Sequence, residues 1–593
     1  MSTQKEKKSW ADNIVDKSSN NGDETPQLRK LSDGSYETSM GDLSEPLLRT
    51  KFNEQSELPQ DGQNSLLQNN IKEGSGKKQE HSDEDKDNQI SGGLKEKIVS
   101  FIVIRAEETD MNGDSSLSTP DNAMSVQKDL TIRRKKVLRR TPTTFWEDAL
   151  KFKDGSIPQS IIVAIVIGVA CGTFGFIYYK TLEWGLDFFW RTLPEKIVVD
   201  KWSEWAYIFW IPLVGMMCSL AVFYTIKYIG EPGDMPITVK YIHEKGYLDM
   251  KYAFPMCIAS LLFMFAGGSL GPEAPLGGIC ASIAGWISRK VFKQTDRNII
   301  RKHTLMGMAG ALAGFFGSPI GGSFFALEIQ SRLGVEYFEH TIEAIFCGQI
   351  TMAVFRGLAG LDVAPLWKIT DTPVSPGGSI YVLIGALLGL FGAFIAYFFK
   401  VFHKHVMLLF VKLNLLKPEN RLKRAVVGAT GFIIIGMFIP YTLFWGENEL
   451  QTILTNGPPQ ELPYAFPAKG LIDFKMDSAL NCFLVGFLKL VSISFCLAAD
   501  FRGGFIFPFF LAGGAFGQFI HFLFPLLPVP YACLCIAAGI NVAITRTAVA
   551  TPIILTFLAN EPNTISATSS ASIVALLATS YMVRKDMLLE LKN

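Results

Sequence analysis

The sequence predicts an all-α protein that crosses a membrane many times, and three observations lead to this prediction. Of the 593 residues, 48% are hydrophobic and only 19% carry a charge, and the mean hydropathy is +0.23. The apolar residues gather in runs of about 20 residues, the length of helix that spans the hydrocarbon core of a bilayer. Clusters of glycine and proline precede or interrupt several of these runs.

Residues 1–140 differ from the rest of the chain and are predicted to be a disordered tail. They are rich in Ser, Asn, Asp, Glu, Lys and Gln and poor in aromatic residues, so they bury too little apolar surface to fold alone. No apolar run precedes residue 98, so no signal peptide is expected. The tail ends in the basic block IRRKKVLRRTPTT (132–144). Basic residues beside the first membrane segment predict that this side faces the cytoplasm.

A single membrane body is predicted over residues 145–590. Its clearest apolar runs are 157–179, 205–226, 379–399 and 425–445. Further basic clusters, at 287–303, 400–424 and 583–586, are assigned to the cytoplasmic side together with both termini. Little chain follows the last apolar segment, so no regulatory domain is expected at the C-terminus.

Composition and motifs favour neither an enzyme nor a nucleic-acid-binding protein. The formal net charge is +1, and we find no nucleotide-binding loop, no metal-ligand cluster and no nucleophile with a base at useful spacing. The nine cysteines lie in or beside apolar runs and are interpreted as small buried residues. His403 and His405 are assigned to a solvated basic loop. No cofactor and no metal are expected.

Gly/Pro clusters open several apolar segments: GEPGDMP (230–236), GSLGPEAP (268–275), GSPIGG (317–322) and RGGFIFP (502–508). Non-helical backbone at membrane depth is tolerated only where protein or a water-filled cavity satisfies it. A helix that begins there points free N–H groups and a positive dipole end into the cavity. Several such starts that meet make an anion site, and similar starts in both halves predict inverted repeats.

Glu273 lies in the second cluster, within GGSLGPEAPLGG (267–278), directly after the apolar run 252–266. An ionised carboxylate at membrane depth is costly, which makes a functional role the first hypothesis. Oriented backbone amides would offset part of that cost. The alternative is structural: Glu273 caps a helix or pairs with a nearby base.

These four clusters, in this order, resemble the chloride channel (CLC) family of anion channels and proton-coupled anion exchangers. GGSLGPEAPLGG is similar to the family segment G-[RK]-E-G-P, and GFIFP (504–508) to G-x-F/I-x-P. FGSPIGGSFFALEI (316–329) is similar to the helix after the gating segment. The resemblance implies a CLC-type fold of about 18 tilted, partly re-entrant helices in two inverted repeats. It also implies a homodimer with one pore per subunit, here without C-terminal CBS domains.

The resemblance implies a role for each residue that matches a family motif. Glu273 takes the place of the gating glutamate, whose carboxylate occupies an anion site until an anion replaces it. Phe505 and Ile506, with Gly504 beside them, are expected to bind the anion through backbone N–H groups. Ala274 is expected to keep such a donor at the outer site.

Other positions depart from the family pattern. Gly233 stands where the family has a serine that favours chloride, in a register set on Pro236, and a one-residue shift would put Asp234 there instead. Pro272 replaces a basic residue and has no N–H to donate, so the outermost anion site is expected to be weaker. A late anion-binding tyrosine has no convincing counterpart, and Tyr581 is not expected to serve.

The choice between channel and exchanger depends on a second glutamate, which passes protons in the family's exchangers. Here Glu328 matches the first residue of the family's Glu-Glu pair and Ile329 occupies the proton-transfer position. Isoleucine carries no proton, so the sequence favours a passive chloride channel in which Glu273 competes with the anion. One alternative is a proton-coupled chloride/nitrate antiporter, in which a water wire or Glu328 replaces the missing acid. Another is a membrane scaffold that has lost conduction.

The expected partners are chloride or other small anions, membrane lipid and a second copy of the chain, with no nucleic acid. The sequence predicts a multi-pass membrane protein with both termini in the cytoplasm. It leaves the plasma membrane and an intracellular membrane equally open.

Overall fold

The computed structural model describes residues 157–199, 204–330, 341–370, 373–375 and 377–590. The predicted tail (1–140), its basic block and residues 145–156 lie outside these ranges. The outcome for those segments is therefore not tested, and they stay predictions.

Within the described ranges the chain forms helices and no β-strand. The first half contains α5 (Ile157–Asp187), α6 (Trp210–Tyr228), α7 (Met235–Lys245), α8 (Met250–Phe265), α9 (Glu273–Trp286), α10 (Arg297–Phe316), α11 (Pro319–Gln330) and α13 (Thr341–Ala359). The second half contains α14 (Ile380–Lys412), α15 (Arg421–Phe438), α16 (Glu449–Leu454), α17 (Ala479–Ala498), α18 (Ile506–Leu523), α19 (Val529–Thr545), α20 (Ala550–Leu558) and α21 (Ile565–Glu590). Short π-helical segments lie at Phe188–Thr192, Glu195–Val199 and Ile287–Val291, and 3-10 turns at Glu204–Phe209, Pro418–Asn420, Pro440–Thr442, Pro459–Glu461 and Pro562–Thr564.

Six helical segments of the described chain are long and apolar enough to cross a membrane. They are Pro158–Val199, Tyr207–Tyr228, Thr341–Ala359, Ile380–Lys412, Ala479–Ala498 and Ile506–Leu523. Three shorter apolar helices accompany them: Met250–Phe265, Pro319–Ile329 and Val529–Thr545. The prediction of an all-α membrane protein with several apolar helices, some of them short, is confirmed.

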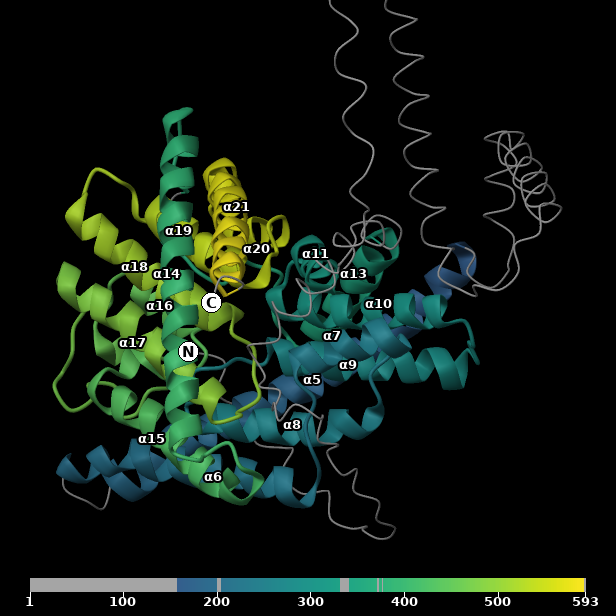
Figure 1. Cartoon of the computed structure of the whole chain (residues 1–593), viewed down its shortest axis with the longest axis horizontal. Helices are drawn as coiled ribbons and strands as arrows, with labels where there is room; N and C mark the ends of the chain where they lie inside the picture. Colours follow the sequence, from purple (N-terminus) through teal and green to yellow (C-terminus); the bar gives the residue numbers. More distant parts are fainter. Residues whose placement is uncertain (1–156, 200–203, 331–340, 371–372, 376, 591–593) are drawn as a thin grey trace, which may run out of the picture.

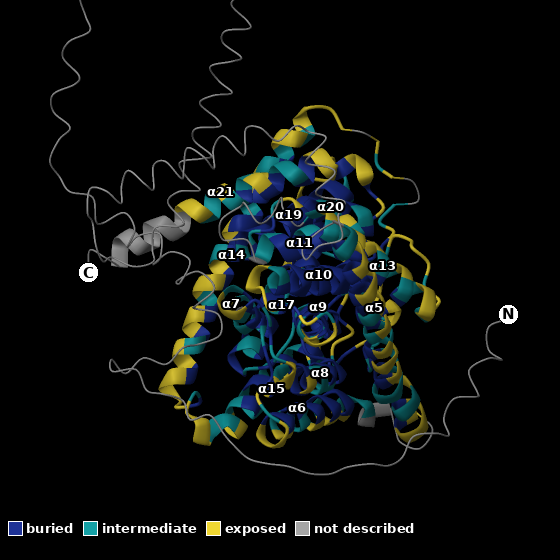
Figure 2. Cartoon of the chain, turned by 90° about the vertical axis from the view of Figure 1, so that its right-hand side faces the viewer, coloured by how far each residue is buried: buried dark blue, intermediate teal, exposed yellow. Residues whose placement is uncertain are grey.

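Helix α10 forms the centre of the first half (Figure 2). It packs against α5, α9, α11 and α13, and its small residues allow close approach. A Cβ on Gly307 would lie 2.4 Å from Cβ of Ala284, and one on Gly310 would lie 2.4 Å from Oγ1 of Thr351. The helices of the second half, such as α14, α17, α18 and α19, gather beside this group (Figure 1).

The long helix α14 carries an exposed apolar stripe along its outer face. Its members recur every three or four residues, the spacing of one helix face. They are Leu383, Leu387, Leu390, Phe394 and Phe398. A continuous apolar stripe on the outside of the molecule is the surface expected to contact lipid acyl chains.

Two sequence-based boundaries are wrong. Helix α14 continues to Lys412, so His403 does not lie in a solvated loop: it is buried, and its Nδ1 lies 2.9 Å from Oγ of Ser494. The predicted apolar run 425–445 is not one helix, because α15 ends at Phe438. Pro440 has no N–H for the helix and forces Ile439 out of the α conformation (φ −129°, ψ 82°).

Candidate anion site at two helix starts

Helices α9 and α18, one from each half, begin beside each other at the glycines that precede them. Gly271 and Gly504 form an isolated antiparallel bridge in which each N–H donates to the other's carbonyl, over 2.7 and 2.6 Å. Pro272 follows Gly271 and stands at the N-cap of α9, and Phe505 does the same for α18. The two Gly/Pro clusters singled out in the sequence therefore meet.

Glu273, the first residue of α9, turns its side chain over this bridge and is fully buried. Its Oε1 accepts a hydrogen bond from the backbone N–H of Phe507 over 3.1 Å. Its Oε2 has no hydrogen-bond partner among the described residues. The carboxylate thus lies at the positive end of α18, the position that an anion prefers at a helix N-terminus. This contact fits both hypotheses for Glu273, because the carboxylate caps a helix of the other half at a position that also suits an anion.

Glycine is required on both sides of this carboxylate. A Cβ on Gly271 would lie 2.0 Å from Oε2 of Glu273, and one on Gly504 would lie 2.6 Å from its Cδ. Both distances are too short for any side chain. The two glycines therefore leave the space that the Glu273 carboxylate fills.

The residues predicted to donate to the anion lie at the start of α18. Phe505 is the N-cap, Ile506 the first helical residue and Phe507 the second, and Pro508 has no N–H. The hydrogen bond to Glu273 comes from Phe507, one residue beyond the predicted pair. The Phe507 ring is fully buried and packs edge-on against Phe315 and Trp367, which fixes the helix start.

Gly233 and Asp234 lie next to each other at the start of α7 and make different contacts. Gly233 is buried, and a Cβ there would meet Met256 Sδ and Tyr252 Cβ at 3.5 Å, an ordinary contact. Asp234 is the N-cap of α7 and accepts from the backbone N–H of Ile237 over 2.7 Å. Sequence reasoning left these two residues as alternatives for one position.

Lys489 is a buried cation that sequence reasoning missed. It lies on α17 and is 0% exposed, and its Nζ donates to the carbonyls of Thr442 (2.9 Å) and Phe444 (2.5 Å). Phe444 adopts φ +54°, a left-handed conformation that is costly for a large residue, and its N–H donates to Gly267 O. Lys489 therefore stabilises the loop on which the stretch before Glu273 rests. The rule applied to Glu273, that an ionisable residue in an apolar segment is functional until shown otherwise, would have found it.

Glu328 is engaged at another helix start. Its two carboxylate oxygens accept from the backbone N–H groups of Val549 (3.0 Å) and Ala550 (2.8 Å), where α20 begins. Ile329 packs its side chain against the hydrophobic core. Tyr581 is largely exposed on α21, unlike the buried Glu273 site.

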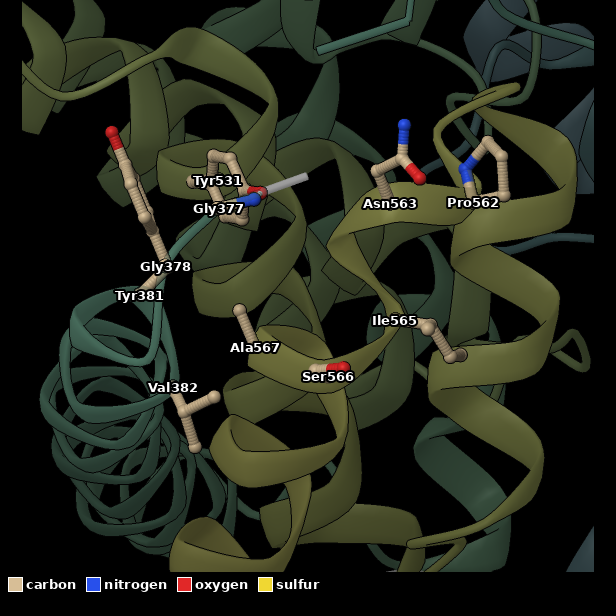
Figure 3. A pocket seen from close by; sticks show the side chains of 10 residues that line it. All are labelled: Gly377, Gly378, Tyr381, Val382, Tyr531, Pro562, Asn563, Ile565, Ser566 and Ala567. Carbon is tan, nitrogen blue, oxygen red and sulfur yellow. Dashed lines mark hydrogen bonds between the residues drawn. The ribbon is translucent and has the colours of Figure 1, made fainter. Parts of the chain in front are cut away.

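A pocket of about 220 Å³ lies apart from these residues, near the starts of α14 and α21 (Figure 3). Tyr381 stacks on Tyr531 at its wall with ring centroids 4.3 Å apart. The Gly377 N–H donates to the Tyr531 hydroxyl over 3.1 Å. None of the residues that the sequence singled out lines this pocket.

Comparison with known proteins supports the family resemblance that the sequence motifs indicate. A family model described as voltage gated chloride channel matches residues 214–580. The putative ion-transport protein YfeO of Escherichia coli O17:K52:H18 (strain UMN026 / ExPEC) is 24% identical over 393 residues, which are 65% of this chain and 84% of that protein. A slow cyanobacterial Cl-/H+ antiporter superposes with a TM-score of 0.58 at 17% identity, over 72% of this chain and 95% of that one. A CLC-type fluoride/proton antiporter superposes with a TM-score of 0.55 at 20% identity, over 72% and 96%. The chain belongs to the voltage-gated chloride channel (CLC) family, and its fold is the CLC fold.

Proposed function

We propose that this membrane protein conducts chloride or another small anion passively, and that Glu273 is its gate. The observation that carries the proposal is the position of the Glu273 carboxylate: fully buried, at the N-terminus of α18, with Oε1 on the Phe507 N–H. The same backbone amides that hold the carboxylate can hold an anion. Anion and carboxylate therefore compete for one place, and conduction requires the carboxylate to leave it.

The contacts of Glu328 and Ile329 support a channel over a proton-coupled chloride/nitrate antiporter. Each oxygen of Glu328 accepts a backbone N–H at the start of α20, so protonating either oxygen weakens a hydrogen bond there. Ile329 has no group that binds a proton. The antiporter is the outcome to be tested against the channel.

The proposal includes a homodimer with one pore in each subunit, embedded in membrane lipid. It also places both termini in the cytoplasm, because basic residues stand beside the first membrane segment. The anion-binding groups are expected at Ala274 and at Gly504, Phe505 and Ile506, joined by the Phe507 N–H. Gly233 or Asp234 is expected beside the central anion site.

The test is chloride efflux from liposomes that contain the purified full-length chain. Glu273→Gln keeps the size of the side chain and removes the charge that competes with the anion, so efflux is expected to rise several-fold. Glu183→Gln is the matched control, since Glu183 is exposed on α5, where it pairs with Lys180. Equal efflux from Glu273→Gln, Glu183→Gln and the unmodified chain would refute the gating role.

A further inference from the structure

The connection between α13 and α14 reaches back into the helical body and places one of its side chains next to the start of α18. It joins two segments that are long and apolar enough to cross a membrane. We call residues 361–370 of this connection the strap. Within the strap, Trp367 is only 1% exposed. A buried tryptophan needs contacts for its ring and a hydrogen-bond partner for its N–H, and the strap supplies it to both.

The strap is fastened to the second half of the chain by its backbone. The N–H groups of Leu366 and Trp367 both donate to the carbonyl of Leu558 at the end of α20, over 2.9 and 2.8 Å. Lys368 forms two hydrogen bonds with Gln451 of α16. Its N–H donates to Oε1 of Gln451 over 2.7 Å, and its carbonyl accepts from Nε2 over 2.8 Å. These bonds fix the strap on both sides of the Trp367 side chain.

The indole of Trp367 is held at its N–H and packs against the start of α18. Its Nε1 donates to the carbonyl of Glu447 over 2.7 Å. Its ring meets those of Phe507 and Phe510 edge-on, with centroids 5.9 and 6.4 Å apart. Phe315, at the end of α10, also meets the Phe507 ring, with centroids 5.6 Å apart. The Phe507 ring is therefore held by α10 and by the strap together.

The backbone of Phe507 carries the N–H that binds the Glu273 carboxylate. This N–H belongs to the first turn of α18, where amides have no partner within the helix, so its position depends on what packs against the residue. The carboxylate has little freedom to follow a shift of that turn, because an atom added to Gly271 or Gly504 would clash with it. A free anion is not tethered and can follow.

We propose that Trp367 is a positioning residue for the gate, and that its indole holds the Phe507 N–H where the tethered Glu273 carboxylate competes best with a free anion. This inference rests on the proposed function and adds a residue that determines how well the gate closes. Removing the indole leaves a cavity into which the start of α18 relaxes. The hydrogen bond to the carboxylate then weakens, and anions occupy its place more often.

The test is chloride efflux from liposomes that contain the full-length chain, with Trp367→Ala introduced alone and together with Glu273→Gln. Alone, Trp367→Ala is expected to raise efflux several-fold. In the Glu273→Gln background no further rise is expected, because the charge that the Phe507 amide holds is already gone. Substitutions that act through one shared contact are not additive, so this pair separates an effect on the gate from general damage to the pore.

A conservative variant and a matched control accompany this measurement. Trp367→Phe keeps an aromatic ring against Phe507 and loses only the donor to Glu447, so its efflux is expected to lie well below that of Trp367→Ala. Trp184→Ala is the control, because Trp184 is 65% exposed on α5 and stacks on Phe188. Its efflux is expected to equal that of the unmodified chain.

If Trp367→Ala does not fold, Gln451→Ala takes its place. It removes both hydrogen bonds to Lys368 and loosens the strap without opening a cavity next to Phe507. Efflux is again expected to rise only while Glu273 keeps its charge.

The outcomes that would overturn the inference differ from those that would overturn the proposed function. If Glu273→Gln raises efflux, but Trp367→Ala changes it by the same factor in both backgrounds or not at all, the gate stands and Trp367 is core packing only. If Glu273→Gln leaves efflux unchanged, the gate and the positioning role of Trp367 are refuted together.

Discussion

Glu273 and Phe507 stand 234 positions apart in the chain, and the backbone N–H of Phe507 donates to the carboxylate of Glu273 over 3.1 Å. The contact joins the first residue of α9 to the second residue of α18. A carboxylate from the first half of the chain therefore lies at the positive N-terminal end of α18, a helix of the second half. Substitutions that remove this contact, or change the donors around it, are expected to change anion flux.

Gly504→Ala is expected to expel the Glu273 carboxylate and raise anion efflux. The three atoms nearest to the added Cβ all belong to Glu273: Cδ and Oε2 at 2.6 Å and Oε1 at 3.0 Å. The effect should vanish when Glu273→Ala is already present, because the clashing atoms are gone. Gly357→Ala is the matched control, since no atom lies within 4 Å of its added Cβ. Equal efflux from both alanine variants would show that Gly504 does not make room for the carboxylate.

Gly233→Ser is expected to increase the preference for chloride over nitrate, because a hydroxyl donor enters the central site. The space allows the change, since the nearest atoms to a Cβ there lie at 3.5 Å. Reversal potentials in mixed chloride and nitrate measure the preference. Unchanged values would mean that Gly233 does not determine selectivity.

Pro272→Ala is expected to strengthen anion binding at the outer end of the site. The backbone of Pro272 (φ −79°, ψ −10°) suits any residue, so the substitution adds one N–H donor and changes little else. The concentration of chloride that gives half-maximal flux should fall. Pro418→Ala, which adds an N–H at an exposed 3-10 turn outside this helix start, serves as the control, and the same fall in both variants would argue against an outer site at residue 272.

Lys489→Met is expected to destabilise the protein by about 1–3 kcal/mol, the usual cost of leaving a buried hydrogen-bonding group without its partner. It removes the Nζ donor from the carbonyls of Leu443 and Phe444, whereas the Thr442 carbonyl keeps the Ser269 hydroxyl. The transition midpoint for thermal unfolding in detergent measures the loss. Lys400→Met, on the exposed side of α14, should leave the midpoint unchanged. A midpoint for Lys489→Met equal to that control would contradict the role assigned to the ammonium.

The helical membrane fold and the burial of Glu273 can be predicted from the sequence because they depend on local patterns. Apolar runs give spans, and Gly/Pro clusters mark helices that start within the body, as the bridge between Gly271 and Gly504 illustrates. Pro440 also marks the end of α15, but the apolar run continues past it and hides that boundary.

The contacts between residues far apart in the chain could not be predicted from local sequence patterns. Asp234 and Arg502 are separated by 268 positions, and Lys489 and Thr442 by 47, so nothing nearby in the chain announces either pair. The sequence predicts Phe505 and Ile506 as donors to the anion, but it does not announce that the Phe507 N–H donates to Glu273, 234 positions away. That contact depends on how the two halves of the chain dock.

The central claim is that anions move through this protein without protons, and the most direct test is the reversal potential for chloride under an imposed pH gradient. The measurement uses purified full-length protein in liposomes. The account predicts that the reversal potential stays at the chloride equilibrium potential whatever the pH gradient, because Ile329 interrupts the proton path. A reversal potential that moves with the pH gradient would contradict it and show a coupled exchanger, with Glu328 the first residue to replace.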